Sequence, residues 1–495
     1  MRQMRLKVFN GYYILLGMLI FFCCFISGCA PDDTKDDIEE EKKEETTEKD
    51  STTQQSYTLK KAMRYYLNSC FPYYYWYDEM NPTVSSYNLT EYKTIDSFFE
   101  ATLYSRDHWS WMALGSYFAQ SETGEYEGTW GASLKQQIEY YNDYDIRVAY
   151  VFPGSPFDQN GVKRGWVLTE LAGRPVMDRV RDGSFYEEYA KSPQTFTFME
   201  DDGTTHTFTA ELESIITGSV LKKTIFWPTD FPGLEEPVGY FNYLTFNANM
   251  LDDIHDAMSF MKEADVHKLI LDLRYNGGGD SRASQLLIDY LAPQSADKKP
   301  YVHRHHNRHF DRYDVIDSIS RMPGSLDLDA IYVIGLSGTA SASEMIINGL
   351  KPYIDLTLVG DTTYGKPNGM YVFMYPDDDA NMNKYNNGDY SGLKYAFLPI
   401  CFYNMNGVGE FIPDDGFIPD NYRPDDLTHD FGVDEDLIKA CLTRISGGDF
   451  PELPKPKYYK AVTKAGFNKS AVLKERRSPL YGLTIEPFPG QMAIE

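Results

Sequence analysis

The residues with the clearest chemical potential are a serine within a run of small residues and a lysine between a glycine and a proline. Ser341 lies in the segment TASASE, residues 339–344, between an apolar strand-like segment and the helix-like segment EMIINGL. A serine at the start of a helix lies beside free backbone N–H groups that can stabilise a developing oxyanion. Serine is also a preferred helix N-cap, and on this motif alone capping is the more frequent role of Ser341 or Ser343.

Lys366 is the second candidate and lies in GKPNG, residues 365–369, 25 residues after Ser341. A lysine accepts a proton only when it is neutral, so burial must lower its pKa from about 10.4 toward neutrality. The stretch from Gly360 to Lys366 also matches the start of a phosphate-binding loop. Pro367 stands where that loop needs Ser or Thr, and a strand-like segment follows instead of a helix, so nucleotide binding is excluded.

The third candidate is the glycine run that follows the apolar segment Leu269–Leu273. Gly277, Gly278 and Gly279 have no side chains, so their backbone N–H groups can turn toward a reacting carbonyl group. A simple turn is the alternative interpretation of such a run when it stands alone.

A histidine-rich stretch offers candidate ligands for a transition metal. It contains His303, His305, His306 and His309. No H-E-x-x-H motif and no cysteine partner accompanies them, so a solvated loop is the favoured interpretation. The sequence therefore predicts neither a metal nor an organic cofactor.

The motifs DLRYNGGG, TASASE and GKPNG together resemble the C-terminal processing, or tail-specific, serine peptidases in order and spacing. The resemblance covers about residues 57–447. It implies a serine endopeptidase with a Ser–Lys dyad, in which Ser341 is the nucleophile and Lys366 the general base. The oxyanion donors that it implies are the N–H of Ala342 and an N–H of Gly277 or Gly278.

One position departs from the pattern of this family. Several members have a glutamine four residues after the lysine, where it orients the amine, whereas this chain has Met370. Met370 supports one alternative to the protease, an inactive or weakly active peptide-binding scaffold. A glycan-binding lipoprotein is a second alternative. The second alternative depends only on the lipid anchor argued below and on the aromatic content of 15%.

The helix-like and strand-like segments that must position these residues indicate a multidomain α+β protein. From about Val238, strand-like and helix-like segments alternate, which indicates an α/β core. The resemblance implies that this core has the ClpP/crotonase type of fold. The predicted domains are a helical N-terminal domain (57–115), a PDZ-like domain (116–215), the protease core (216–447) and a C-terminal tail (448–495).

The PDZ-like prediction depends on a strand–turn–helix pattern and on a hairpin. Thr195–Met199 and Thr204–Phe208 alternate in polarity around Asp202-Gly203, which is a strong hairpin signal. PDZ domains bind an extended peptide, usually a C-terminus, at a sheet edge. Protein or peptide substrates recognised at their C-termini are therefore the expected partners. Trp166 stands where PDZ domains of this kind usually have Asp, so the sequence does not define the peptide specificity.

The N-terminus predicts a lipid-anchored protein of the cell envelope. Basic residues precede an apolar run, Tyr12–Ile26, that ends in Ile-Ser-Gly-Cys29. This resembles a bacterial lipobox, which implies removal of residues 1–28 and acylation of Cys29; an ordinary secretory signal is the alternative. Residues 29–56 form an acidic tether that resembles the surface-export signal of Bacteroidetes-type lipoproteins. An outer-membrane location, facing the periplasm or the surface, is expected.

The net charge and the cysteine content limit the partners and the disulfide bonds that the sequence predicts. The net charge is −26 and the pI is about 4.7, so nucleic acid is not an expected partner. Cys70, Cys401 and Cys441 remain after the signal segment and the lipid cysteine are set aside. Three cysteines without a CxxC motif give no disulfide framework, and small buried side chains are expected.

Overall fold

The computed structural model describes residues 58–141, 143–376, 378–386, 389–453 and 484–486. All of them lie in one compact unit, Thr58–Glu495. The signal segment, Cys29 and the acidic tether lie outside the described residues. Among the helices of the described part, none has the length and apolar character that crossing a membrane requires.

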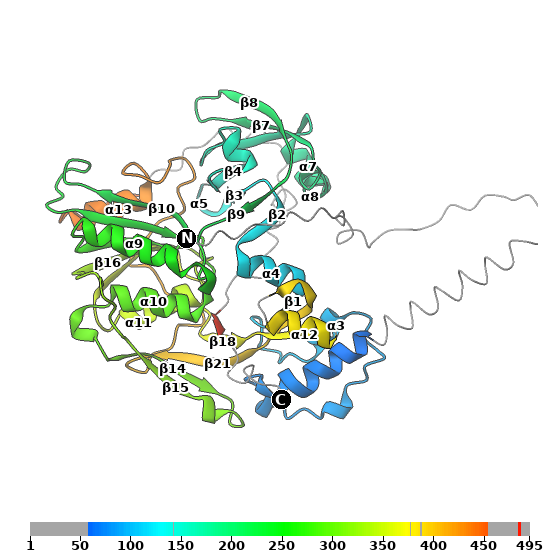
Figure 1. Ribbon diagram of the computed structural model, residues 1–495. Coiled ribbons are helices and arrows are strands. Elements are labelled where there is room, and N and C mark those ends of the chain that lie inside the picture. Colours follow the sequence, from blue (N-terminus) through cyan, green and yellow to red (C-terminus); the bar gives the residue numbers. More distant parts are fainter. Residues whose placement is uncertain (1–57, 142, 377, 387–388, 454–483, 487–495) are drawn as a thin grey trace, which may run out of the picture. The chain divides into compact units, whose positions relative to one another are not determined.

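The centre of the fold is a six-stranded, mostly parallel sheet (Figure 1). Only the edge strand β10 runs antiparallel to its neighbour. Strands β11, β12, β16 and β17 lie in the region where strand-like and helix-like segments are predicted to alternate from about Val238. In sheet order the strands are β10 (Val220–Phe226), β11 (Val238–Tyr243), β12 (Lys268–Asp272), β16 (Ala330–Gly335), β17 (Asp355–Gly360) and β22 (Asn421–Tyr422).

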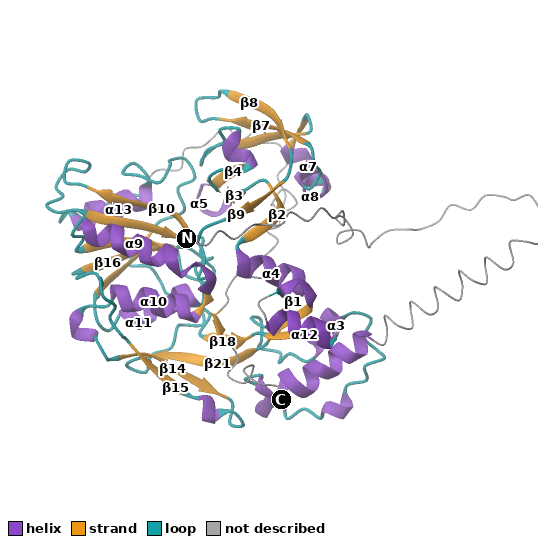
Figure 2. Ribbon diagram, viewed as in Figure 1, coloured by secondary structure: helices purple, strands orange, loops and turns teal. Residues whose placement is uncertain are grey.

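Helices cover both faces of this sheet, which is why its central strands are apolar throughout rather than alternating. Leu269 and Leu271 of β12 pack in one hydrophobic core, and Ile270 between them packs in the core on the other face. Helices α9 (Leu251–Glu263), α10 (Ser281–Leu291) and α11 (Ala342–Leu350) contribute to the first core, and α13 (Asp436–Ile445) to the second (Figure 2). The predicted α/β arrangement of this region is confirmed.

A second six-stranded sheet carries the strand that follows the lysine motif. Its order is β13 (Gly279–Asp280), β23 (Thr484–Glu486), β18 (Asn368–Tyr371), β21 (Ile400–Asn406), β14 (Pro300–His306) and β15 (Val315–Ser318). The histidine-rich stretch is therefore mostly strand, and its interpretation as a solvated loop is wrong. β14 pairs with strands on both sides, and His306 is buried where its Nε2 lies 2.7 Å from the Tyr371 hydroxyl.

The N-terminal described residues share a core with strands from much later in the chain. Tyr66, Phe98 and Phe99 pack with Phe373 and Phe397. A small antiparallel sheet joins the same regions in the order β1 (Trp111–Leu114), β20 (Leu393–Leu398) and β19 (Phe373–Pro376). Helices α3 (Ile95–Ala101), α4 (Gly115–Thr123) and α12 (Asp379–Asn386) lie in these regions. The predicted helical segment thus packs as part of a larger unit.

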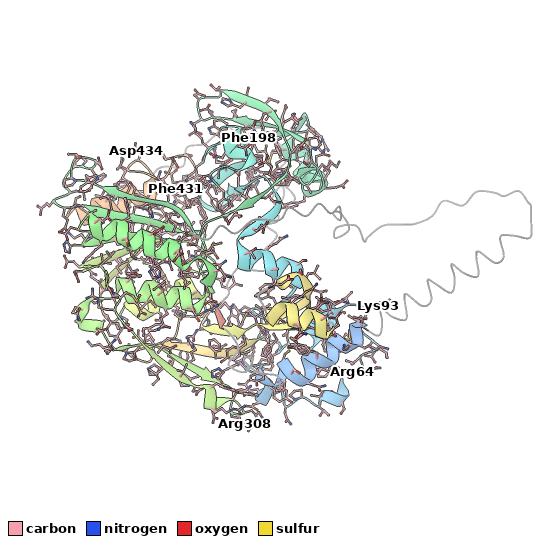
Figure 3. The ribbon with its side chains drawn as sticks, viewed as in Figure 1. Arg64, Lys93, Phe198, Arg308, Phe431 and Asp434 are labelled. Carbon is pink, nitrogen blue, oxygen red and sulfur yellow. The ribbon has the colours of Figure 1, made fainter. Side chains whose placement is uncertain are left out.

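A β-rich segment, residues 125–216, follows. Its main sheet has the order β3 (Ala132–Gln137), β4 (Asp143–Val151), β5 (Val167–Leu171), β7 (Gln194–Met199) and β8 (Thr205–Ala210), and β6 (Arg174–Pro175) pairs with β5. The predicted hairpin is confirmed by the antiparallel β7–β8 pair. Aromatic residues, including Trp130, Phe157 and the Phe198 labelled in Figure 3, form its core together with helices α7 (Val176–Asp182) and α8 (Phe185–Tyr189). The predicted domain boundaries themselves stay predictions.

Candidate active site

Ser341 occupies the turn between the central strand β16 and helix α11. It is the N-cap residue of α11 and is almost completely buried, with 1% of its surface exposed. Its backbone has φ +56° and ψ −109°, a conformation that costs free energy for any residue with a Cβ atom. In α/β-hydrolases, a strained strand-to-helix turn presents the nucleophile, because it projects the side chain from the end of a sheet.

The neighbouring threonine holds this turn in place. The Thr339 hydroxyl donates a hydrogen bond of 2.8 Å to the carbonyl oxygen of Leu273 and accepts one of 2.9 Å from the N–H of Leu336. Leu273 directly follows β12, and Leu336 directly follows β16. The turn is thereby fixed to the ends of two adjacent parallel strands.

Lys366 lies in the loop between β17 and β18 and is 2% exposed. Gly365 before it has φ +82°, and a Cβ atom there would lie 2.1 Å from the carbonyl oxygen of Asp414. Only glycine fits at this position, because any side chain would require both an unfavourable φ and a displaced backbone. The glycine of the motif therefore serves to bring Lys366 into the protein interior.

Burial lowers the pKa of Lys366 from about 10.5 to about 7, because desolvation disfavours the ammonium form. The carboxylates of Asp107 and Glu344 oppose this shift and raise the pKa. The Nζ atom lies 3.7 Å from the sulfur of Met370, which is only a weak acceptor. A substantial neutral fraction near pH 7 is what a lysine needs in order to act as a base.

The buried carboxylate of Glu344 connects the serine turn to the lysine loop. Its Oε2 accepts 2.9 Å hydrogen bonds from the backbone N–H groups of both Ser341 and Lys366. Its Oε1 accepts from the Thr363 hydroxyl at 2.6 Å and from the Gly365 N–H at 2.7 Å. Because one oxygen binds both backbones, Ser341 and Lys366 lie side by side although they come from different loops.

The glycine run reaches the same place through Asn276. The Asn276 carbonyl oxygen accepts from the Ser343 hydroxyl at 3.0 Å and from the Ala340 N–H at 3.3 Å. The Ser343 side chain therefore ties the serine turn to the glycine loop. The Gly278 N–H donates to the Asn276 side chain at 2.8 Å, so it is not free for an oxyanion.

Two of the candidate oxyanion donors remain open. Within the described ranges, no hydrogen-bond acceptor is recorded for the N–H of Gly277 or for that of Ala342, the first residue of α11. Gly277 is also the one half-exposed residue among the buried residues on either side of it. Two N–H groups at the edge of one site are the arrangement that stabilises a tetrahedral oxyanion.

Three residues with a part in this site were not singled out from the sequence. The spacing Ser341-x-x-Glu344 is a capping-box signal, and it could have identified Glu344 as an acceptor for backbone N–H groups. Asn276 belongs to the glycine motif, but its two-sided bonding cannot be read from the motif. Asp107 lies far from Lys366 in the sequence and gives no local signal.

The start of the glycine motif forms a buried ion network. Asp272 accepts from the Tyr240 hydroxyl at 2.7 Å and from Arg274 Nε, and Arg274 in turn binds Glu435. The Tyr275 hydroxyl donates to Asp425 at 2.7 Å. These bonds fix the residues immediately before Asn276 and the glycine run.

Arg164 extends the network into the β-rich segment. Its guanidinium group donates to the Tyr275 hydroxyl at 2.7 Å and binds Asp425 at 3.1 Å. It also lies over the ring of Phe431, 4.3 Å from the ring centre. One buried side chain of the β-rich segment thus contacts a residue two positions before Gly277.

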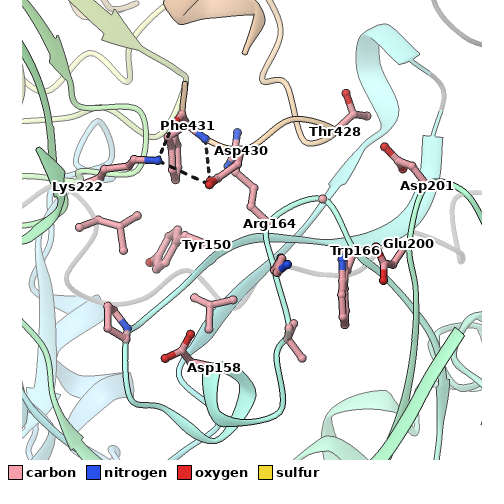
Figure 4. A pocket seen from close by; sticks show the side chains of 16 residues that line it. Tyr150, Asp158, Arg164, Trp166, Glu200, Asp201, Lys222, Thr428, Asp430 and Phe431 are labelled. Atoms are coloured by element: carbon pink, nitrogen blue, oxygen red, sulfur yellow. Dashed lines mark hydrogen bonds and ion pairs between the residues drawn. The ribbon is translucent and has the colours of Figure 1, made fainter. Parts of the chain in front are cut away.

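A pocket of about 400 Å³ lies beside Arg164, apart from Ser341 and Lys366 (Figure 4). Lys222 contributes one wall, where its Nζ donates to the Phe431 carbonyl oxygen at 2.5 Å and lies 3.6 Å from Asp430. Trp166 stands on the other side. The lining mixes acidic, basic and aromatic residues, and the cations of Arg164 and Lys222 already have partners, so the pocket does not single out one ligand class.

Metal binding has no equivalent support in the described part of the chain. Its His, Cys, Asp and Glu residues form no group of three or more that could hold an ion. His305 and His306 instead lie near Asp314, and His309 lies near Asp78.

Comparison with known proteins gives a family for the region that holds these residues. Residues 237–396 match the model of peptidase family S41. This range includes Ser341, Ala342, Lys366 and the glycine run.

Curated relatives match parts of the chain at low identity. A chloroplastic carboxyl-terminal-processing peptidase 3 of Arabidopsis thaliana is 28% identical over 221 residues, which are 43% of this chain and 41% of the relative. A carboxyl-terminal-processing protease of a Picosynechococcus strain is 26% identical over 275 residues, 52% of this chain and 58% of the relative. The chain therefore spans about two fifths to three fifths of the length of these relatives.

Among solved structures, one assigned to the S41 proteases of Bacteroides fragilis is 22% identical, with a TM-score of 0.60. The match covers 76% of this chain and 95% of that one. At this level of identity the likeness shows a common fold.

Proposed function

Residues 237–396 form a domain of peptidase family S41, and on this premise we propose that the protein is a serine endopeptidase with Ser341 and Lys366 as its catalytic dyad. The observation that carries the proposal is the buried Lys366. The pKa of its amine is lowered to about 7. Its backbone N–H and that of Ser341 both donate to the same oxygen of the Glu344 carboxylate.

In the proposed reaction, the Ser341 hydroxyl oxygen attacks the carbonyl carbon of the scissile peptide bond, and neutral Lys366 takes the hydroxyl proton. The N–H groups of Gly277 and Ala342 stabilise the oxyanion of the tetrahedral intermediate. Lys366 then gives the proton to the leaving amine, and an ester of Ser341 remains. Water hydrolyses this ester with Lys366 again acting as the base.

The direct test compares wild type with Ser341→Ala, Lys366→Ala and the double variant in the cleavage of an unstructured polypeptide. Each single variant should lose cleavage, and the double variant should be little worse, because the two residues act as a unit. EDTA should leave the wild-type rate unchanged. Full activity of Lys366→Ala would refute the dyad.

A matched control separates loss of chemistry from loss of structure. Lys351→Ala removes an exposed lysine just after α11 and should change neither cleavage nor folding. Circular dichroism of all variants should match wild type. If Lys366→Ala lost its native spectrum, Lys366→Met, whose side chain is nearly as long as that of lysine, would replace it in the comparison.

We further propose that the β-rich segment binds substrates at their C-termini in the manner of a PDZ domain. Strand β3 (Ala132–Gln137) forms one edge of its main sheet, and an open sheet edge can accept an extended peptide. Peptides that end in a free carboxylate should therefore have a lower KM than their C-terminal amides. Equal KM values for the two series would contradict this part of the proposal.

The lipid anchor remains a proposal based on the sequence. Cys29 follows a lipobox-like segment, and a diacylglycerol linked to its sulfur as a thioether would hold the protein at the cell envelope. Mass spectrometry of the mature protein should find Cys29 as the acylated first residue. An unmodified chain that begins elsewhere would refute this, and protease treatment of intact cells would distinguish a surface from a periplasmic location.

A second candidate function follows from Met370. In the part of the chain that the structure describes, Lys366 Nζ donates to the thioether of Met370, a weak acceptor that orients the amine less than a glutamine would, and a peptide-binding scaffold without turnover is the alternative. This alternative predicts that peptides bind equally well to wild type and Ser341→Ala while neither protein cleaves them.

A further inference from the structure

A short strand from the C-terminal tail lies between the two catalytic loops. β23, Thr484–Glu486, pairs in parallel with β13 on one side and with β18 on the other. Thr484 is opposite Gly279, and Ile485 is opposite both Asp280 and Met370. The short red arrow beside β18 in Figure 1 marks this strand.

The two strands that flank β23 begin just after two residues of the proposed active site. β13 continues the glycine run and starts two residues after Gly277, and β18 starts two residues after Lys366. β18 uses its other edge for β21, and β13 makes only a single bridge to Phe246 on its other side. The sheet order β13-β23-β18 therefore means that β23 fills a one-strand slot between these loops.

We propose that this slot is where the protease binds substrate as an extended strand, and that residues 484–486 occupy it as an internal competitor. The inference deepens the proposed function and rests on it. The edges of β13 and β18 that pair with β23 could pair with another extended peptide in its place, largely regardless of the sequence of that peptide. A tail segment of the same chain has the advantage of a high effective concentration.

The parallel register gives the bound strand a direction. Both β13 and β18 run away from the catalytic loops, so the N-terminal end of β23 is the end nearest to them. A substrate held in the same way has the bond to be cut on the N-terminal side of the slot. The slot then holds the part of the substrate that is C-terminal to the scissile bond.

The sequence of the tail agrees with a short, self-limiting insertion. Thr-Ile-Glu is followed by Pro487, and proline has no N–H to continue a ladder of hydrogen bonds. A competitor of three paired residues can be displaced by a longer substrate strand.

The first test uses the full chain with Ile485→Pro, which removes a ladder donor from β23. The initial rate of peptide cleavage should rise, on the order of tenfold, as the slot opens. Val472→Pro places the same residue in the tail outside β23 and should leave the rate at the wild-type value. An unchanged rate in Ile485→Pro, with wild-type cleavage intact, would overturn the inference and leave the protease function standing.

The second test does not depend on turnover. In the Ser341→Ala background, a fluorescent peptide of residues 480–489 should bind Ile485→Pro at least about tenfold more tightly than the protein with the native tail. The amides of residues 485 and 486 should be protected from hydrogen exchange with the native tail and lose that protection when the peptide is added. Equal binding to both proteins, or no protection of these amides, would refute the competitor even if the protein cleaves no peptide.

Discussion

At the scale of single residues, the lowered pKa of Lys366 determines how the proposed reaction should depend on pH. Only its neutral form accepts a proton, so kcat/KM should rise with pH through a midpoint of about 7. Asp107 raises the pKa of Lys366, so Asp107→Asn should move this midpoint to lower pH. Profiles of kcat/KM between pH 5 and pH 9 for wild type and Asp107→Asn measure the midpoint and its shift.

Asp96→Asn is the control for the Asp107 variant. Asp96 is an exposed carboxylate of α3, in the same N-terminal region, and its removal should leave the midpoint unchanged. A midpoint that moves to higher pH in Asp107→Asn would show that this carboxylate does not act on Lys366 through its charge.

The same residue should make stability depend on pH. The pKa of Lys366 is about 7 in the folded protein and about 10.4 in the unfolded chain, so the folded state binds fewer protons between these values. The contribution of Lys366 to the free energy of unfolding is thus most unfavourable below pH 7 and vanishes above about pH 10. Lys366→Met should therefore be more stable than wild type by a few kcal/mol at pH 6, and the difference should shrink as pH rises.

Urea unfolding of wild type and Lys366→Met at pH 6, 8 and 10 would measure this trend. Lys351→Met, at an exposed site, should show no pH-dependent difference. A constant difference between Lys366→Met and wild type at all three pH values would mean that Lys366 is not desolvated in the folded state.

At the scale of elements, Glu344 fixes helix α11 to the loop before β18. Each of its two oxygens accepts two hydrogen bonds, so in Glu344→Gln the amide NH₂ must face two donors whichever way it points. We expect a loss of about 2–4 kcal/mol in the free energy of unfolding and a fall in kcat. Glu263→Gln, at an exposed position of α9, is the control and should match wild type in both measurements.

Gly365 tests how the lysine loop reaches the interior. Gly365→Ala combines φ +82° with a Cβ atom 2.1 Å from the Asp414 carbonyl oxygen, so the loop must move and the unfolding free energy should fall by about 3 kcal/mol or more. Gly409→Ala is a matched control because it has φ +88° and no atom within 4 Å of the new Cβ. It should lose only about 1 kcal/mol and retain activity. If both variants lost the same free energy of unfolding in thermal or urea unfolding, the positive φ alone, and not the contact with Asp414, would account for the loss.

Elements that follow from local pattern were predictable, and those that depend on distant partners were not. The apolar run Leu269–Leu273 and the turn at Asp202-Gly203 carry their own signals, and the structure has a strand and a hairpin there. The strand-like segment that follows the lysine motif, residues 370–375, divides at Val372 between two sheets. That division depends on β20 and β21, which pair with its two halves.

The candidate site shows the same limit. Short motifs predict Ser341, Lys366 and the glycine run as site residues, because each motif places particular residue types close together in sequence. Asp107 acts on Lys366 only through the tertiary fold, so no local pattern could reveal it. The occupation of the Gly278 N–H by Asn276 likewise depends on side-chain geometry.

At the scale of the whole molecule, Arg164 connects the β-rich segment to the loop that ends in Gly277. Arg164→Met removes its bonds to Tyr275 and Asp425 and leaves the carboxylate with fewer partners. Activity on a short peptide, too small to reach β3, should fall on the order of tenfold in kcat with little change in KM, since the loop that carries the proposed oxyanion donor Gly277 loses support. Wild-type kcat in this variant would show that the β-rich segment does not support the catalytic loop.

Lys163→Met is the control for this experiment, because Lys163 is the exposed neighbour of Arg164 and lines the same pocket. It should leave kcat unchanged. If both variants lost the same activity, the pocket surface rather than the bond from Arg164 to Tyr275 would be responsible.

The parallel course of β23 has a kinetic consequence for an enzyme that forms an ester with its substrate. A substrate bound in that direction leaves its C-terminal fragment in the slot, with backbone partners on two sides, after the peptide bond is broken. The new amine of that fragment then stays beside the ester and competes with water for it. Added peptide amines should therefore be joined to the acyl group in a measurable share of turnovers, so that aminolysis accompanies hydrolysis.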